Sequence, residues 1–283
     1  MILHPVNLEA MELVAQKLAD KKLARYLCET LAPVLHCMPG DPDAVPNFVA
    51  IARKDAIAAG FEHGRKYSTH VLISFLLGPG WENDLPREAL QPVFDDAGMP
   101  LLTRLDMAVN KAIQLRQQID KNLPSMHVVF QHLLQTTAHS LSAEDIWPAF
   151  SQMAVLRGVK TPAHLQRLFA TLEADALALL HLPPIARRKY SAYDLAGLRH
   201  MGRAVPLPTE GLHILHPQQL SGFIHHVLLA LSFGRFYRRN PLFTTLHRLL
   251  QQPPQQHNAL LRQFLQGHQN TLRETAYDQE CGE

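Results

Sequence analysis

The chain has few cysteines, few charged side chains and few aromatic rings for its length. Its three cysteines, Cys28, Cys37 and Cys281, are scattered over 283 residues, so they form neither a disulfide framework nor the CxxC motif of a zinc or redox site. Only 18% of the residues are charged whereas 47% are hydrophobic, which excludes intrinsic disorder as the main state. The low cysteine content is typical of a reducing compartment, and we expect a cytoplasmic protein.

Long apolar runs are also missing. The two longest, Val71 to Leu77 and Val227 to Phe233, are far shorter than the roughly 18 residues that a membrane-spanning helix needs. The first fourteen residues, MILHPVNLEAMELV, lack the basic region and the apolar run of a secretory signal. We therefore expect no membrane insertion and no cleaved leader, and both apolar runs predict buried core helices.

An excess of either charge is absent as well. The chain has 27 basic and 25 acidic side chains and a formal net charge of +2, which disfavours a nucleic-acid partner. The sequence contains no GxSxG nucleophile elbow, no GxxxxGK[ST] phosphate loop and no GxGxxG dinucleotide motif. We therefore predict that the protein is not an enzyme, with no catalytic residue and no cofactor.

Helical patterning is abundant. Apolar residues recur every three or four positions, and the segments between them carry helix caps and stops. This predicts an all-α protein, either a multi-helix bundle or stacked helical hairpins, with no substantial sheet. The first helix is expected to begin at the cap Asn7, and its apolar side is expected to carry Leu8, Met11, Val14, Leu18 and Leu27. The spacing predicts early helices over 7–32, 47–59, 68–77 and 100–121.

Later helix starts are marked by caps. Ser142 with Asp145, and Ser191 with Asp194, have the spacing of a capping box. The pairs Thr161-Pro162 and Asn240-Pro241 each combine an N-cap residue with a proline at the first helical position. Each of these four sites predicts that a helix begins there, whereas the prolines within 204–216 predict an irregular loop.

Domain organisation depends on Pro124. This proline follows the helix predicted over 100–121, and its ring disfavours a helix interior. The interpretation is an N-terminal helical region over 1–123 and a C-terminal helical region over 124–283. Helical hairpins that stack straight through this point, giving one continuous domain, are the alternative.

Histidine is over-represented, with 17 residues, and imidazole binds metal ions. Four of the histidines, His213, His216, His225 and His226, lie within 213–226. Pro217 interrupts the first pair, and the stretch has neither an HExxH motif nor an acidic partner. We predict no metal site, and a metal-dependent enzyme that uses 213–226 stays an alternative.

A cluster of arginines and aromatic rings follows the apolar run that ends at Phe233. Arginine and aromatic residues are enriched among the residues that dominate protein–protein binding, although the same mixture occurs on nucleic-acid surfaces and at helix C-termini. We predict a partner-binding surface here, with Phe233 facing the core. The candidate residues are Arg235, Phe236, Tyr237, Arg238 and Arg239.

One segment, 48–85, resembles a known group of proteins. Its signature is a helix that ends in Gly60-Phe61, an apolar helix, the turn Gly78-Pro79-Gly80-Trp81 and the acidic Asp84, with 104–106 (Arg-Leu-Asp) fitting the next helix. This pattern resembles small helical accessory proteins that are encoded beside type VI secretion spike and PAAR-effector genes. The basic residues in 63–66 depart from the more acidic sequence expected at that point.

The resemblance implies a chaperone or co-chaperone that binds and stabilises a secreted effector, or its adaptor, before loading. It offers no catalytic residues, and it gives Gly60, Phe61, Gly78, Pro79 and Trp81 the role of structural anchors. An immunity protein that inhibits a toxin is the alternative. Inhibitors of nucleases commonly present an acidic face, which this near-neutral chain does not suggest.

Overall fold

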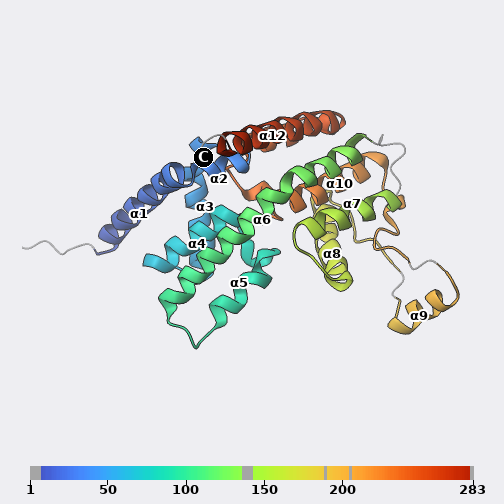
Figure 1. Cartoon of the computed structure of the whole chain (residues 1–283), viewed down its shortest axis with the longest axis horizontal. Helices are drawn as coiled ribbons and strands as arrows, with labels where there is room; N and C mark the ends of the chain where they lie inside the picture. Colours follow the sequence, from blue (N-terminus) through green and yellow to red (C-terminus); the bar gives the residue numbers. More distant parts are fainter. Residues whose placement is uncertain (1–7, 136–142, 188–189, 204–205, 281–283) are drawn as a thin grey trace, which may run out of the picture. The chain divides into compact units, whose positions relative to one another are not determined.

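The computed structural model describes residues 8–135, 143–187, 190–203 and 206–280 (Figure 1). All regular structure in these ranges is helical, and they contain no strand, which confirms the predicted all-α fold. None of the described helices is both long enough and apolar enough to cross a membrane. The chain forms two compact units: unit 1 comprises 1–117, 236–248 and 271–283, and unit 2 comprises 118–235 and 249–270.

Unit 1 is built around α3 and α4, which pack on each other, with α1 against α3. Phe48 of α3 and Phe75 of α4 are both fully buried and meet edge to face, with ring centroids 5.7 Å apart. The elements of unit 1 are α1 (Leu8–Thr30), α2 (Ala32–Cys37), η1 (Pro42–Ala44), α3 (Val45–Ala58), α4 (Gly64–Leu77), η2 (Trp81–Asn83), α5 (Pro86–Asp95), the first part of α6 (Leu101–Gln135), η4 (Tyr237–Arg239), most of α11 (Thr244–Leu250) and the last part of α12 (His257–Glu280).

A polar contact joins the three helices at the centre of unit 1. The Tyr67 hydroxyl of α4 donates a hydrogen bond of 2.6 Å to the Asp20 carboxylate of α1. Arg53 of α3 lies 3.3 Å from the second oxygen of the same carboxylate. Asp20 thereby fixes the positions of α3 and α4 along α1.

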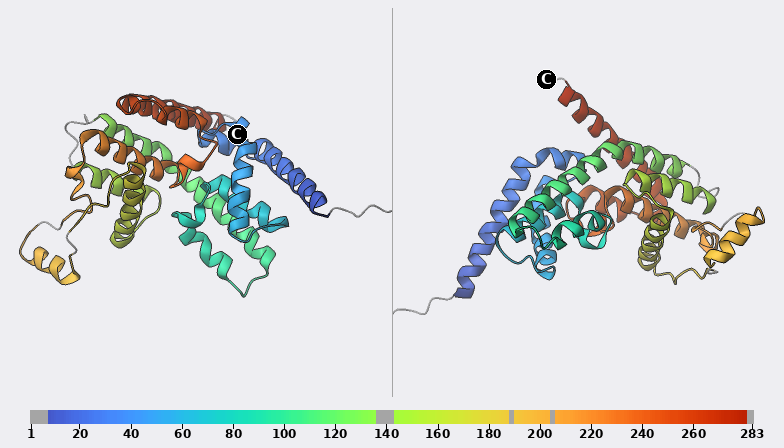
Figure 2. Two further views of the ribbon diagram at one scale, coloured as in Figure 1. Left: turned by 180° about the vertical axis from the view of Figure 1, so that it is seen from behind. Right: turned by 60° about the horizontal axis from the view of Figure 1, so that its bottom comes forward.

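Unit 2 is organised around α10, which packs on α7 and α8. All eleven residues of 223–233 are buried, as expected for a core helix, and Phe233 faces the core as predicted. Figure 2 gives two further views of these helices. The elements are the second part of α6, α7 (Ala143–Leu156), α8 (Pro162–Leu179), α9 (Ala192–His200), η3 (Leu212–Ile214), α10 (Pro217–Phe233), η5 (Pro254–Gln256) and the first part of α12.

Several predicted helix ends are confirmed. Gly60 follows α3 with φ +81°, and Gly78 ends α4 with φ +102°, a region that favours glycine. The Thr161 hydroxyl accepts a hydrogen bond from the amide of His164 at the start of α8. Ser191 and Asp194 form the reciprocal bonds of a capping box. Ser142 lies outside the described residues, as does Asn7.

Two proline-based predictions are wrong. The helix does not end before Pro124, because α6 continues to Gln135; burial of Leu123 and Met126 in unit 2 outweighs the roughly 3 kcal/mol that an interior proline costs. Asn240 does not begin a helix either. Its side-chain oxygen accepts a hydrogen bond from the amide of Leu242, so a turn forms first and α11 starts at Thr244.

The first and third predicted helices also need correction. α1 ends at Thr30, and Pro33 lies in the first turn of the separate α2. The expected apolar side of α1 is covered only near the end of the helix, since Leu27 is 0% exposed whereas Val14 is 66% exposed and Leu18 is 52% exposed. α4 begins at Gly64 rather than at Ser68, so its first turn is polar and only the later part is apolar.

Candidate partner-binding site

The predicted partner segment 235–239 begins with an arginine that is held inside unit 2. Gly234 ends α10 with φ +92° and places Arg235 opposite α8. There the guanidinium donates two hydrogen bonds, of 2.6 and 2.9 Å, to the carboxylate of Asp175. Arg235 therefore links α8 to the end of α10, and the exposed fraction of its side chain is 24%.

Tyr237 is part of the core of unit 1. The ring is 1% exposed, and burial raises the pKa of its phenol. The neighbouring Phe236 packs so closely on Gly80 that a Cβ at that glycine would lie 2.7 Å from the ring. The prediction that Tyr237 contacts a partner is corrected accordingly, because a ring with so little accessible surface packs against its own chain.

Arg238 and Arg239 are the exposed members of the segment. The guanidinium of Arg238 lies 5.7 Å from the centre of the Tyr237 ring and donates to its hydroxyl. Arg239 lies over the ring of Phe236 and donates a 2.8 Å hydrogen bond to Asp55 of α3. Partner contact by Phe236, Arg238 and Arg239 stays a prediction, and Arg239 already has an acidic neighbour within unit 1.

The predicted structural anchors surround an aromatic cluster in unit 1. Pro79 and Trp81 are buried, and the Trp81 indole stacks on Phe94 of α5 with the ring centroids 5.8 Å apart. Phe61, which is partly exposed, meets the same Phe94 edge to face at 5.6 Å. The turn after Gly78 thus connects α4 to α5 through Trp81.

A serine, a histidine and a carboxylate lie in line beside this cluster. His70 Nε2 contacts the carboxylate of Glu82, and its Nδ1 lies 3.4 Å from the Ser74 hydroxyl. A nucleophilic serine needs this order of groups, but it also needs access to a substrate. Ser74 and His70 are both 0% exposed, so the arrangement connects α4 to η2 and offers no open hydroxyl.

The histidines of 213–226 are separated by the fold. His213 and His216 are exposed, whereas His225 and His226 are buried in α10. Burial lowers the pKa of His225 to about 4, although its Nε2 lies 2.5 Å from the amide oxygen of Asn258. Among the residues that the structure describes, no group of three or more histidine, cysteine or acidic side chains is placed to hold a metal ion.

Two segments of unit 2, 185–187 and 209–212, lie side by side and form what we call the neck. Arg187 donates two hydrogen bonds, of 2.5 and 2.6 Å, to the largely buried carboxylate of Glu173 in α8. Its Nε donates a third to the backbone oxygen of Glu210. A Cβ on Gly211 would lie 2.9 Å from Ile185, so glycine is needed for the two segments to approach. Thr209 and Leu212 are buried beside them.

Beyond this neck the described residues 190–203 and 206–208 form an arm that contains α9. None of the arm residues whose burial is described is buried. Tyr193 in α9 is 87% exposed, and Met201, which directly follows the helix, is 60% exposed. Figure 1 and the left view of Figure 2 show α9 standing apart from α8 and α10 of its own unit. The sequence predicts the helix that follows Ser191, but not that this helix stands apart from the core of unit 2.

Replacing Arg187 by glutamine is expected to lower the free energy of unfolding by about 2 kcal/mol, because hydrogen bonds between two charged groups are lost. The substitution leaves the Glu173 carboxylate, of which the side chain is 10% exposed, without its cation. Chemical denaturation measures this change, and limited proteolysis should show faster cleavage within 190–208. The matched control is Arg167→Gln on the exposed side of α8. Equal protease resistance of the Arg187 variant and the wild type would contradict the assigned role of the neck.

No protein family, no curated protein and no solved structure matches the chain.

Proposed function

We propose that this chain is a non-enzymatic accessory protein that binds another protein through the arm that contains α9. The observation that carries the proposal is the exposure of Tyr193 in α9 and of Met201 directly after it, in an arm that has no described buried residue. An isolated helix of nine residues is marginal in water, so α9 gains stability from a surface that covers it. Large exposed apolar side chains on an ordered base are typical of a protein interface.

Gly197 supports the same proposal. It lies inside α9 between Tyr193 and Met201, where a Cβ would have no heavy atom within 4 Å. Packing within the chain therefore does not require a glycine, which costs about 0.5 to 1 kcal/mol relative to alanine in a helix. A partner that inserts a ridge between the two large side chains would use the missing Cβ.

The finer part of the proposal is the class of partner. The segment 48–85 resembles accessory proteins of type VI secretion, and its signature residues form the packed turn between α4 and α5. We infer a chaperone or co-chaperone whose arm binds a secreted effector or the adaptor of that effector. The recognised surface is apolar, with a ridge that fits against Gly197 between Tyr193 and Met201.

The test is affinity purification from the native host followed by identification of the bound protein. Wild type is expected to retain a secreted effector or its adaptor, and Tyr193→Ala is expected to reduce the recovered amount at least tenfold, as for a hot-spot residue. Tyr26→Ala on α1, another exposed tyrosine, is the matched control and should leave recovery unchanged.

A second pair of variants separates folding from binding. Gly197→Ala is expected to preserve folding and to weaken binding, whereas Gly267→Ala, at another helical position with open space, should not affect binding. Equal partner recovery by the Tyr193, Gly197 and control variants would refute the arm as the binding site. Recovery of a toxin that the protein inactivates, with protection of cells, would replace the chaperone by an immunity protein.

A further inference from the structure

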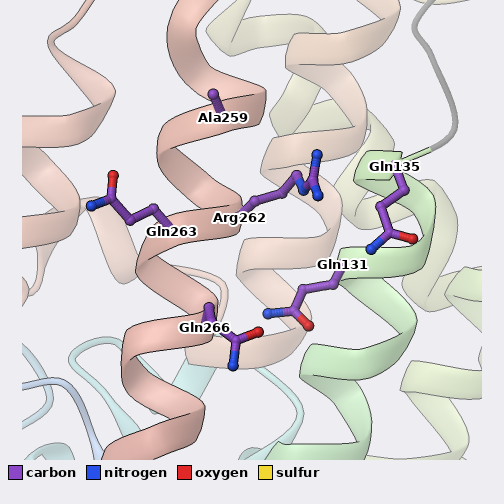
Figure 3. Close-up of a pocket in the computed structure, with 6 residues that line it drawn as sticks. All are labelled: Gln131, Gln135, Ala259, Arg262, Gln263 and Gln266. Atoms are coloured by element: carbon purple, nitrogen blue, oxygen red, sulfur yellow. The ribbon is translucent and has the colours of Figure 1, made fainter.

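A groove in unit 2 is lined mainly by glutamine side chains. It lies between the second part of α6 and the first part of α12 and has a volume of about 360 Å³. Four of its six lining residues are glutamines, one is an arginine and one is an alanine, and none contributes an aromatic ring or an acid. The lining residues are Gln131, Gln135, Ala259, Arg262, Gln263 and Gln266 (Figure 3).

The spacing of these residues follows from the two helices. Gln131 and Gln135 are one turn apart on α6, and Ala259, Arg262 and Gln266 recur at three and four on α12. The opposite face of α12 contributes Leu261 and Leu265, both 0% exposed, to the core. The apolar face thereby fixes the rotation of α12 and places the amide face along the groove.

Several donors and acceptors in the groove have no hydrogen-bond partner among the described residues. The side chains of Gln131 and Gln135 make no hydrogen bond with any described residue. The amide nitrogen of Gln266 donates to Asn270 at 3.1 Å, which leaves its oxygen as an acceptor. Figure 3 shows this oxygen directed toward Gln131, while Gln263 points away from α6. Donors and acceptors from both helices therefore face the same space.

Arg262 gives the groove its charge. Its guanidinium reaches from α12 toward α6 in Figure 3, and it has no ion-pair partner among the described residues. A guanidinium binds a carboxylate through two parallel hydrogen bonds. The combination of one cation with several amides matches a peptide backbone, which alternates N–H and C=O groups, that carries one carboxylate.

We propose that this groove binds an extended, acidic peptide segment, with its carboxylate on Arg262 and its backbone on the glutamine amides. The stretch of α12 from 259 to 266 is about 10 Å long, which corresponds to about three residues of extended chain. The site is separate from the arm, and the proposal does not rest on the function proposed above.

The experiment uses the full-length chain labelled with ¹⁵N, in which NMR detects the side-chain NH₂ groups of the glutamines. Three probes are titrated: acetyl-Gly-Asp-Gly-amide, acetyl-Gly-Asn-Gly-amide and acetyl-Gly-Gly-Gly with a free C-terminus. The aspartate peptide or the free carboxylate is expected to shift the signals of Gln131 and Gln266. The asparagine peptide should bind at least tenfold more weakly. Whichever binds more tightly, the aspartate peptide or the peptide with the free C-terminus, shows whether the carboxylate comes from a side chain or from a chain end.

Arg262→Gln is the decisive variant, and Arg273→Gln, an exposed arginine later in the same helix, is its matched control. Arg262→Gln should remove the tenfold preference for the carboxylate, whereas Arg273→Gln should keep it. The proposal is overturned if no peptide shifts these signals, or if both variants reduce binding equally. Tighter binding of a short single-stranded oligonucleotide at the same signals would also overturn it, in favour of a phosphate backbone.

Discussion

Replacing Trp81 by alanine is expected to lower the free energy of unfolding by about 3 to 5 kcal/mol, because a large side chain is removed from a packed core. The indole is 3% exposed and contacts rings from two helices: Phe94 of α5 at 5.8 Å and His70 of α4 at 5.7 Å. Both contacts would be lost, and the turn at 78–81 would no longer hold α4 to α5. Denaturant unfolding followed by circular dichroism measures the change.

The variant Trp81→Phe tests how much of this loss comes from the volume of the side chain. The indole Nε1 is buried and has no hydrogen-bond partner among the described residues, so phenylalanine removes volume without breaking a polar contact. We expect a loss of about 1 to 2 kcal/mol for this variant, well below that of alanine. An unchanged midpoint for Trp81→Ala would show that the indole does not stabilise unit 1 and would remove its role as an anchor.

Local sequence signals predicted the features that depend on a few neighbouring residues. Gly60 and Gly78 end helices because the chain needs positive φ there, and the residues alone give that preference. Thr161 and Ser191 cap helices through their own hydroxyls. The positive-φ glycines and the hydroxyl caps each involve only three or four neighbouring residues, so they do not depend on the rest of the fold.

Signals that compete with tertiary contacts were less reliable. Pro124 alone should end a helix, but contacts on both sides of it hold α6 in place. The Asn122 side chain donates a 2.7 Å hydrogen bond to the backbone oxygen of Leu156, and Met126 is fully buried. Val14 and Leu18 have helical spacing, yet no described element covers them. Periodicity predicts which residues share a face, and it does not say whether another element packs on that face.

The candidate site was the least predictable feature. Composition predicts a partner-binding surface at 235–239. In the structure Tyr237 is buried, and Arg235 pairs with Asp175, sixty residues away in sequence. The arm carries weaker signals, namely Gly197 inside a helical pattern and the prolines 206 and 208. Its neck depends on Arg187 meeting Glu173 across α8, a contact that spacing does not reveal.

Two buried histidines make folding sensitive to acid. His127 is 0% exposed, and burial together with the neighbouring His268 lowers its pKa from 6.5 to about 3. Both of its ring nitrogens lack a hydrogen-bond partner among the described residues, and its ring lies 5.0 Å from that of His268 and 6.0 Å from that of Phe233. His225 is similar, with a pKa lowered to about 4 by burial and, to a lesser extent, by His257.

The sign of the effect follows from which state binds protons first. As the pH falls through 6.5, the unfolded chain protonates these two side chains while the folded chain keeps them neutral. Stability is therefore fully present above that pH and decreases on acidification, until the pH reaches the folded pKa values. By pH 5 each histidine is expected to cost about 2 kcal/mol of unfolding free energy, or about 4 kcal/mol together.

The measurement is urea unfolding at pH 7.5 and at pH 5 for wild type and two single variants. His127→Leu removes one of the two buried imidazoles and should roughly halve the loss between these pH values, to about 2 kcal/mol. The variant should fold at pH 7.5, since leucine replaces a ring that makes no hydrogen bond with the described residues around it. His213→Gln, at an exposed position, is the matched control and should keep the wild-type loss. If His127→Leu and His213→Gln lose the same stability on acidification, His127 is not a buried neutral side chain and its proposed share of the effect is wrong.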